Sequence, residues 1–371
     1  MSERPAFNPE ELKVIGGHPC GGLSTLENMG AVGLPKQEPI FNRPISCKEN
    51  FRLAFSGEKP YWLPQTGWAY CDVNNFRPRI ILDNVVTHLV MDGEAPIQYE
   101  TDTMTGWFGL DWVYVPVAGG ATVKPGKPLI EDMNDWKDII KWPDLDALDW
   151  EEMGRKNKEY LNTTQLNELG ILDGFWERLI SLMDVSGAAM ALIDENQQDA
   201  VKEFFDQYAD FLIDYIRHVK AVCDIDAVLM HDDWGTQNGP FFSLDTAREM
   251  LVPYIKRVID YIHSEGMYYE QHSCGNCTKL VPAYIEAGVD FWNPQPMNDI
   301  DAITELCKEK GPYIAVGDVP LAPDATEAEI RQAARDFFDH YHGKKVFYAP
   351  MAPNPVFLEE LYIYSRQEFA K

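Results

Sequence analysis

The sequence predicts an α/β fold, a closed (β/α)8 TIM barrel with an N-terminal extension, and three observations predict it. Short apolar runs alternate with helical patterns through the C-terminal part of the chain, which implies a parallel sheet. The length of 371 residues is ordinary for a barrel with insertions. No Gly-x-Gly-x-x-Gly follows an early strand, as an open dinucleotide-binding sheet would require. We therefore divide the chain into an irregular extension or cap at 1–65 and a catalytic barrel at 66–371.

The expected elements follow in chain order. An alternating segment at 108–117, running up to Gly119 and Gly120, predicts a strand or hairpin, and apolar residues at helical spacing predict a helix over 198–220. Beyond it, short apolar runs predict strands at 227–230, 267–272, 289–292, 313–316 and 345–348. Helices are expected at 243–264, 279–286, 301–308, 326–343 and 356–369. The fourth of these begins with a capping box formed by Thr326 and Glu329.

Composition excludes several classes of function. The net charge is −27, from 59 acidic and 32 basic residues, so the chain lacks the basic surface that nucleic acid or an anionic membrane would require. No apolar run approaches the roughly 18 residues that span a bilayer. The seven cysteines are odd in number and mostly scattered, and no secretory signal opens the chain. We expect a reduced, cytoplasmic protein whose clustered cysteines serve metal binding or catalysis.

The segment 267–277 concentrates the residue types that bind metals. If it begins as a strand, Glu270, His272 and Cys274 point to one face, because side chains alternate along a strand. Cys277 follows in the strand-to-helix turn. Thiolates and imidazoles are the usual protein ligands of zinc, so this segment is a candidate floor of an active site. Two alternatives remain: a redox Cys-x-x-Cys pair at a helix start, and ordinary burial.

Polar residues also follow the other predicted strands, at the face where TIM barrels place their chemistry. After the strand at 227–230, His231 and Asp233 are candidate catalytic residues, with Asp233 favoured for substrate or proton handling. Two adjacent carboxylates cannot both face inward, so we expect only one of Asp232 and Asp233 to act. The candidate substrate-binding residues at these strand ends are Trp234, Gln237, Asn293 and Asp318.

With these residues in place, the chain resembles the uroporphyrinogen decarboxylase-like superfamily, and within it the zinc-dependent, corrinoid-linked methyltransferases. The resemblance is carried by 231–237 (His-Asp-Asp-Trp-Gly-Thr-Gln), 272–276 (His-Ser-Cys-Gly-Asn), 287–290 (Ala-Gly-Val-Asp) and 316–318 (Val-Gly-Asp). Further pieces at 61–64 and 76–79 resemble the branch that demethylates methoxylated aromatic compounds. The resemblance implies a (β/α)8 barrel, zinc at His-x-Cys, and methyl exchange between a small substrate and cobalamin on a separate corrinoid protein.

One departure from the family pattern affects the metal ligands. The branch that methylates thiols takes its third zinc ligand from a cysteine after the last strand, where this chain has Ala349, Pro350 and Met351. Cys277 is the obvious replacement, with Glu270 as the fourth ligand. The expected zinc ligands are therefore Glu270, His272, Cys274 and Cys277.

The leading hypothesis is O-demethylation: transfer of a methyl group from a small methoxylated substrate, expected to be aromatic, to a corrinoid partner, with zinc as Lewis acid. The chain lacks Asp-x-His-x-x-Gly, the usual corrinoid-binding signature, so the cobalamin must be supplied by another protein. The alternatives are a methylcobalamin:thiol methyltransferase, a metal-independent decarboxylase and a non-catalytic binding barrel. The sequence leaves self-association into a homo-oligomer open.

Overall fold

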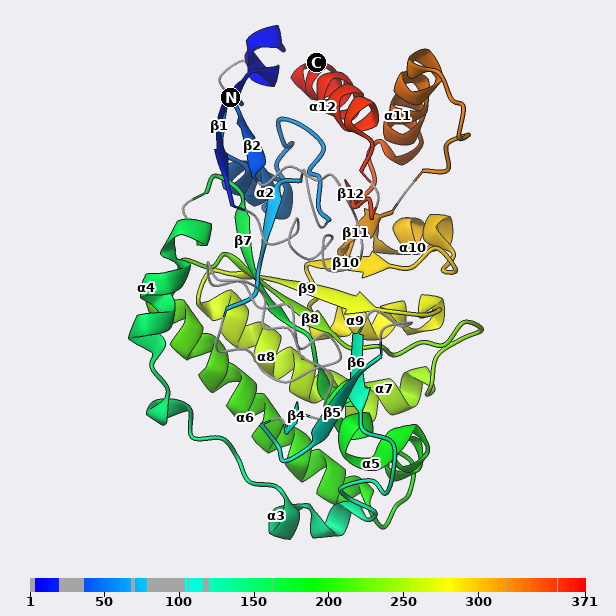
Figure 1. The fold of residues 1–371 in the computed structure, drawn as a ribbon. Helices are drawn as coiled ribbons and strands as arrows, with labels where there is room; N and C mark the ends of the chain where they lie inside the picture. The colour runs from blue at the N-terminus through cyan, green and yellow to red at the C-terminus, as the bar shows by residue number, and fades with distance from the viewer. Residues whose placement is uncertain are drawn as a thin grey trace.

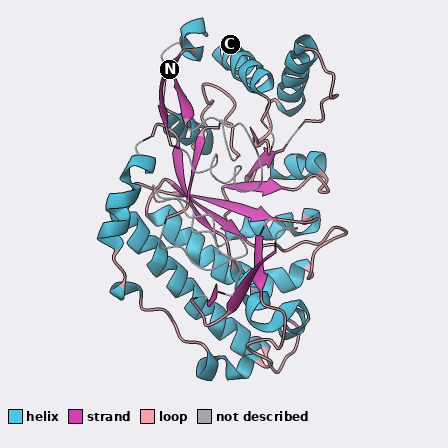
Figure 2. Ribbon diagram, viewed as in Figure 1, coloured by secondary structure: helices cyan, strands magenta, loops and turns pink. Residues whose placement is uncertain are grey.

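The computed structural model describes residues 4–19, 37–67, 71–78, 104–105, 107–115, 120–161, 163–317, 319–351 and 353–371. Helices surround a central sheet of strands (Figure 2). Among the described residues, no helix is both long enough and apolar enough to cross a membrane.

Seven parallel strands form the central sheet (Figure 1). They are β3 (Val73–Phe76), β7 (Leu166–Ile171), β8 (Ala227–His231), β9 (Tyr268–Ser273), β10 (Phe291–Pro294), β11 (Tyr313–Val316) and β12 (Val346–Tyr348). They are hydrogen-bonded in the order β12-β11-β10-β9-β8-β7-β3. Between the two edge strands, segment 64–66 pairs with Tyr348 of β12, and the Gln65 carbonyl accepts a 2.6 Å hydrogen bond from the amide of Asp72, just before β3. The fold is the predicted α/β, TIM-barrel-like fold, with seven parallel strands in the described residues where eight were expected.

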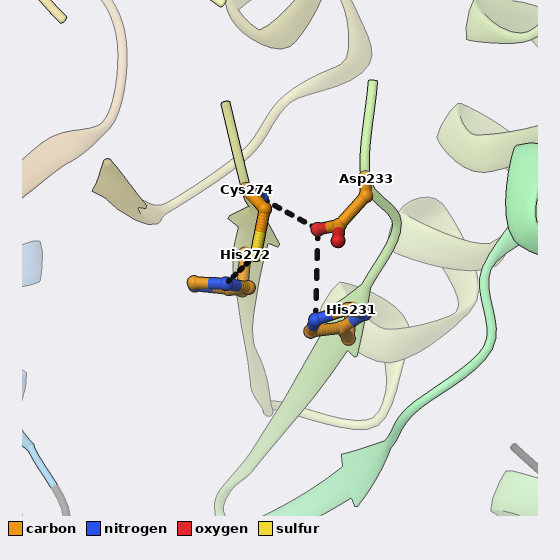
Figure 3. A group of neighbouring side chains, drawn as sticks. All are labelled: His231, Asp233, His272 and Cys274. Atoms are coloured by element: carbon orange, nitrogen blue, oxygen red, sulfur yellow. Dashed lines mark hydrogen bonds and ion pairs between the residues drawn. The ribbon is translucent and has the colours of Figure 1, made fainter. Parts of the chain in front are cut away.

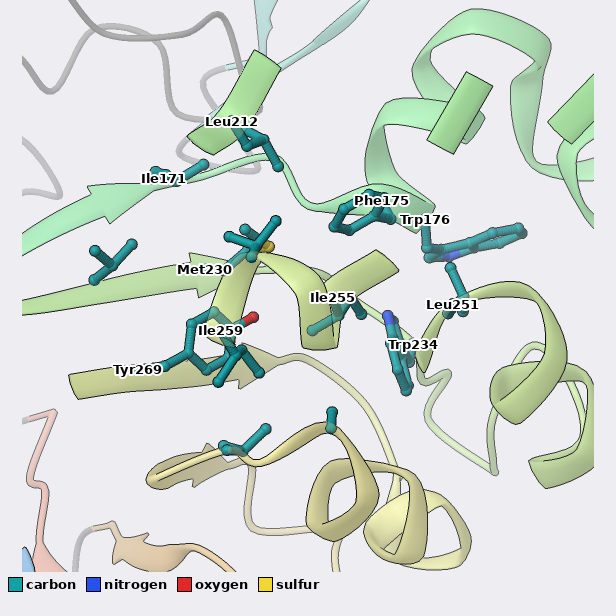
Figure 4. Close-up of a cluster of buried hydrophobic side chains, with 14 of the residues drawn as sticks. Ile171, Phe175, Trp176, Leu212, Met230, Trp234, Leu251, Ile255, Ile259 and Tyr269 are labelled. Carbon is teal, nitrogen blue, oxygen red and sulfur yellow. The ribbon is translucent and has the colours of Figure 1, made fainter. Parts of the chain in front are cut away.

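Helices cover the outside of this sheet. They are α4 (Trp150–Leu161), α5 (Phe175–Ala191), α6 (Gln198–Val222), α7 (Leu244–Met250), α8 (Val252–Ser264), α9 (Val281–Ala287), α10 (Ile300–Cys307), α11 (Glu327–Tyr341) and α12 (Pro355–Ala370). Figure 4 shows the core between one part of the sheet and its helices, where Met230 of β8 and Tyr269 of β9 lie near Ile255 and Ile259 of α8. Because strand side chains alternate, the neighbours of these residues point into the barrel.

The five strands predicted beyond residue 226 are all present, each displaced by at most two residues at either end. The capping box of Thr326 and Glu329 at the start of α11 is also confirmed. The helix predicted at 243–264 is instead two helices that meet at Leu251, whose backbone is not helical (φ −121°, ψ −50°). Pro253 explains the break, because proline has no N–H to donate and its ring would clash with the preceding turn of a continuous helix.

The N-terminal segment, expected to be irregular, contains regular structure. Strands β1 (Val14–His18) and β2 (Glu38–Phe41) are antiparallel, and helix α2 (Cys47–Phe55) follows them. Phe51 and Phe55 of α2 contact aromatic residues at the starts of β9 to β12, so the helix closes the N-terminal end of the barrel. The remaining short elements are the 3-10 turns Pro9–Leu12, Met133–Asp135, Leu145–Ala147 and Thr278–Leu280, helix α3 (Trp136–Ile139), and strands β4 (Met104–Thr105), β5 (Asp111–Val115) and β6 (Gly120–Val123). Strand β5 lies within the strand or hairpin predicted at 108–117, and its antiparallel partner β6 lies beyond that segment.

Candidate metal centre

Four side chains with metal-binding atoms meet at the C-terminal ends of β8 and β9 (Figure 3). His231 ends β8 and Asp233 follows it, while His272 lies in β9 and Cys274 follows that strand. The register of the two parallel strands pairs His231 with His272, so their imidazoles lie side by side with ring centroids 4.9 Å apart. We call this group the His231–Cys274 tetrad.

The spacing of the tetrad suits a tetrahedral metal. Its four candidate ligand atoms all lie within 4.8 Å of one another. Cys274 Sγ is 3.6 Å from His272 Nε2, and His231 Nε2 is 3.5 Å from Asp233 Oδ1. In a tetrahedral zinc site, bonds of roughly 2.0–2.3 Å place neighbouring ligand atoms about 3.3–3.6 Å apart. A sulfur, two imidazole nitrogens and a carboxylate oxygen are also a donor set that zinc accepts, so the residues fit the ion.

Burial and charge set the protonation of these side chains. Burial, together with the neighbouring His231, lowers the pKa of His272 to about 4, so this imidazole is neutral at physiological pH, as a ligand must be. Burial also acts to lower the pKa of His231, but the carboxylates of Glu177 and Asp233 outweigh it and raise that pKa well above its usual value. Burial raises the pKa of the Cys274 thiol, and His231 partly offsets this effect. A metal must therefore displace protons from His231 and Cys274.

The two adjacent carboxylates at the end of β8 face opposite sides of the strand. Asp233 faces the tetrad, where Oδ1 accepts a 2.5 Å hydrogen bond from the amide of Cys274. Asp232 is fully buried on the opposite side and accepts hydrogen bonds from the indole N–H of Trp234 and from the amides of 175–177, at the start of α5. Burial raises the pKa of Asp232 to about 7, while these N–H donors favour its charged form. Asp232 thus fastens β8 to α5.

Two glycines let the loop after β9 lie directly on the loop after β8. Gly275 adopts φ +79°, and a Cβ atom there would lie 2.3 Å from the backbone carbon of Gly235. The amide of Asn276 donates a 2.8 Å hydrogen bond to the carbonyl of Thr236 across the same contact. The amide of Gly275 donates to the side-chain oxygen of Gln295 after β10. Cys274 is therefore held by backbone contacts among three neighbouring loops.

The expected ligands Glu270 and Cys277 lie outside the tetrad, and the structure instead brings His231 and Asp233 together with His272 and Cys274. Glu270 lies on the same face of β9 as His272, but two residues along a strand span about 6.6 Å, which places it deeper in the barrel. There it lies near Glu168 and Arg77, and burial followed by the charge of Glu168 raises its pKa well above the usual value.

Cys277 is also placed away from the tetrad's ligand atoms. Its side chain is fully buried, with Sγ 3.1 Å from Ser273 Oγ. Burial raises the pKa of this thiol to about 11. The turn after β9 directs Cys277 into the core, whereas Cys274 stays on the inner face of the strand.

The expected substrate-binding residues occupy different environments. Asn293 is paired with His272 in the register of β9 and β10 and is partly exposed. Gln237 is exposed in the loop after β8. Trp234 is fully buried against Phe242 and Tyr284, so its side chain supports the loop from within the core. Asp318 lies outside the described residues.

Glu177, in the first turn of α5, also contacts the tetrad and was not predicted from the sequence. Its carboxylate Oε2 lies 3.2 Å from His231 Nδ1, on the side of the imidazole away from Asp233. The strand that leads to it, β7, contains Asn167, Glu168 and Gly170, so it lacks the apolar run that marks the later strands. A glutamate shortly after a predicted strand would have been the signal, had the strand been recognised.

Together these observations define a TIM-barrel protein with a candidate metal centre at the C-terminal face of its strands. The family of uroporphyrinogen decarboxylase (URO-D) matches residues 161–349, which include the whole tetrad and Glu177, and this chain belongs to that family. A search of curated proteins found no match.

Three solved structures show remote similarity. A B12-independent methionine synthase from a Shewanella species has 12% identity and a TM-score of 0.37, covering 62% of this chain and 67% of that one. The catalytic domain of an endo-beta-1,4-mannanase from a Bacillus species has 12% identity and a TM-score of 0.33, covering 62% and 72%. A sugar phosphate isomerase/epimerase from Parabacteroides distasonis has 10% identity and a TM-score of 0.30, covering 66% and 83%.

Proposed function

We propose that this protein is a zinc-dependent methyltransferase that moves a methyl group from a small methoxylated, aromatic substrate to the cobalamin of a separate corrinoid protein. The observation that carries the proposal is the tetrad of His231, Asp233, His272 and Cys274, whose ligand atoms cluster within 4.8 Å. TIM barrels have their active sites at the C-terminal ends of the strands, and the tetrad lies at that position. The motifs His-Asp-Asp and His-Ser-Cys-Gly, on which the resemblance to the corrinoid-linked branch rests, supply all four residues.

The tetrad would hold zinc, and the bound ion would supply a Lewis acid for the ether oxygen, whose departure as an alkoxide or phenolate is otherwise slow. The chain's own residues prepare that site. His272 is neutral, and Asn293 lies beside it in the register of β9 and β10. Asp233 and Cys274 are tied to each other through the Cys274 amide. The ring of Trp234, next to Asp233, is fully buried and packs against Phe242 and Tyr284 beneath the loop.

The test combines metal analysis with a methyl-transfer assay. Zinc per chain is measured by elemental emission before and after chelation, and transfer from methoxylated benzoates to reduced cobalamin is followed by its absorbance. We expect about one zinc per chain, and loss of both zinc and methyl transfer in Cys274→Ala. A Cys274→Ala variant that is inactive yet retains a full equivalent of zinc would contradict the ligand assignment. Methylcobalamin consumption that requires an added thiol would instead identify the thiol methyltransferase.

Family membership supports a second candidate, a decarboxylase that works without metal. Chelator-resistant release of carbon dioxide from a carboxylated substrate would identify it. The same tetrad variants separate the two candidates, because a metal-independent decarboxylase has no need for the sulfur of Cys274. Retained decarboxylation in Cys274→Ser would favour the second candidate.

A further inference from the structure

Glu177 is a buried carboxylate placed against one candidate ligand of the metal. It lies in the first turn of α5, and only 4% of its surface is exposed. Its Oε2 is 3.2 Å from His231 Nδ1, while His231 Nε2 faces Asp233 at 3.5 Å. The imidazole of His231 therefore lies between two carboxylates, one inside the tetrad and one outside it.

This arrangement selects which nitrogen of His231 is available to a metal. A carboxylate only accepts hydrogen bonds, so Glu177 requires a proton on Nδ1. The proton on Nδ1 leaves the lone pair of the neutral imidazole on Nε2, which is the nitrogen that faces Asp233 of the tetrad at 3.5 Å. A carboxylate behind a ligating histidine also makes the imidazole a stronger ligand.

The fold holds Glu177 in this position from its other end. The amide of Glu177 donates a 2.9 Å hydrogen bond to Asp232 Oδ1, and Asp232 directly follows His231 in the chain. Residues 231 and 232 thus contact the side chain and the backbone of Glu177. The start of a helix also favours negative charge. Within the described parts of the chain, His231 is the ion-pair partner found for Glu177.

We propose that Glu177 is a positioning residue that fixes the tautomer and orientation of His231 and thereby strengthens metal binding by the tetrad. The inference rests on the proposed metal site, and it adds a residue that contacts neither the metal nor the substrate. A buried carboxylate is costly to desolvate unless it is paired. Glu177 is paired with His231, a candidate metal ligand, rather than with a lysine or arginine.

The experiment measures zinc affinity by competition with a chromogenic chelator. We expect Glu177→Ala to raise the zinc dissociation constant by about 10–100-fold, as is typical for removing such a partner. Glu177→Gln keeps a hydrogen-bond acceptor without the charge, so we expect it to restore part of that loss. The matched control is Glu360→Gln in α12, a glutamate that is 5% exposed and paired with Arg331 and Arg335. The control should lower stability but leave the zinc dissociation constant within about twofold of the original.

A double-mutant cycle with His231→Ala separates positioning from general damage. If Glu177 acts through His231, adding Glu177→Ala to His231→Ala changes zinc affinity no further. Independent effects in the cycle, or an unchanged zinc affinity in a folded Glu177→Ala protein, would overturn the inference. An original protein that binds no zinc would overturn the proposed function instead. In that case the nitrogen-15 spectrum of His231 still tests whether Glu177 keeps the proton on Nδ1.

Discussion

Replacing Gly275 with alanine should both destabilise the protein and loosen the metal centre. Its φ of +79° costs an L-residue roughly 1–2 kcal/mol. The added Cβ would lie 2.3 Å from the backbone carbon of Gly235, whereas carbon atoms in contact are about 3.5 Å apart. The two loops must therefore separate by about 1.2 Å, which breaks the hydrogen bond from Asn276 to Thr236 at a further cost of about 1 kcal/mol. We expect a total loss of about 2–3 kcal/mol.

Gly343 is the matched control for this prediction. It adopts φ +78°, but a Cβ there would have no atom within 4 Å, so Gly343→Ala carries the backbone cost alone. Urea denaturation of the metal-free proteins measures the free energy of unfolding, and chelator competition measures zinc affinity. Gly275→Ala should be less stable than Gly343→Ala by at least about 1 kcal/mol and should bind zinc more weakly. Equal stability of the two variants, with equal zinc affinity, would refute the argument that the loop contact positions Cys274.

Two further predictions concern single side chains. Cys277→Ser should leave the zinc dissociation constant within a few-fold of the original, whereas Cys274→Ser should raise it by at least about tenfold. The reason is that, of these two thiols, Cys274 is the one with its sulfur in the tetrad. Equal losses of zinc affinity in the chelator assay would return Cys277 to the ligand set. The hydrogen bond with Asp290 raises the pKa of His263. The pair therefore stabilises the folded protein fully below the ordinary histidine pKa of about 6.5, and this stabilisation is lost as the pH rises through the raised pKa. The imidazole is partly exposed, so we expect His263→Ala to lower the free energy of unfolding by less than about 1 kcal/mol at pH 6 and by still less at pH 9. Urea denaturation measures this loss, and a loss that grew with pH would contradict the predicted pH dependence.

The fold was predictable where local sequence agrees with tertiary structure. Strands β8 to β12 each begin with apolar or aromatic residues, and glycines follow the helices between them, so the limits of each element can be predicted from the local sequence. Strand β7 was missed because its inner face carries Glu168 and Gly170. The position of Gly170 is filled by the guanidinium of Arg77, since a Cβ there would lie 1.8 Å from Nη1. A polar layer inside a barrel depends on partners from distant parts of the chain, and no local pattern reveals it.

The candidate site was predictable in part. His272 and Cys274 followed from strand alternation and ligand chemistry, and both lie in the tetrad. Alternation predicts which face of the strand a side chain lies on but not how deep in the barrel it lies. For this reason Glu270 was grouped with His272, which lies about 6.6 Å further along the strand. Cys277 lies in a turn, where the direction of a side chain depends on backbone angles that the sequence does not specify.

The register between β8 and β9 determines which residues form the tetrad. Neither the end of β8 nor the end of β9 alone supplies four ligands, and each contributes two residues separated by one position. The register that aligns His231 with His272 brings the two pairs together, and that register is fixed by the packing of Met230 and Tyr269 on the outer face of the sheet. A shift of one residue between these strands would turn one pair of ligands toward the helices. The metal centre is therefore specified as much by the apolar residues between the ligands as by the ligands themselves.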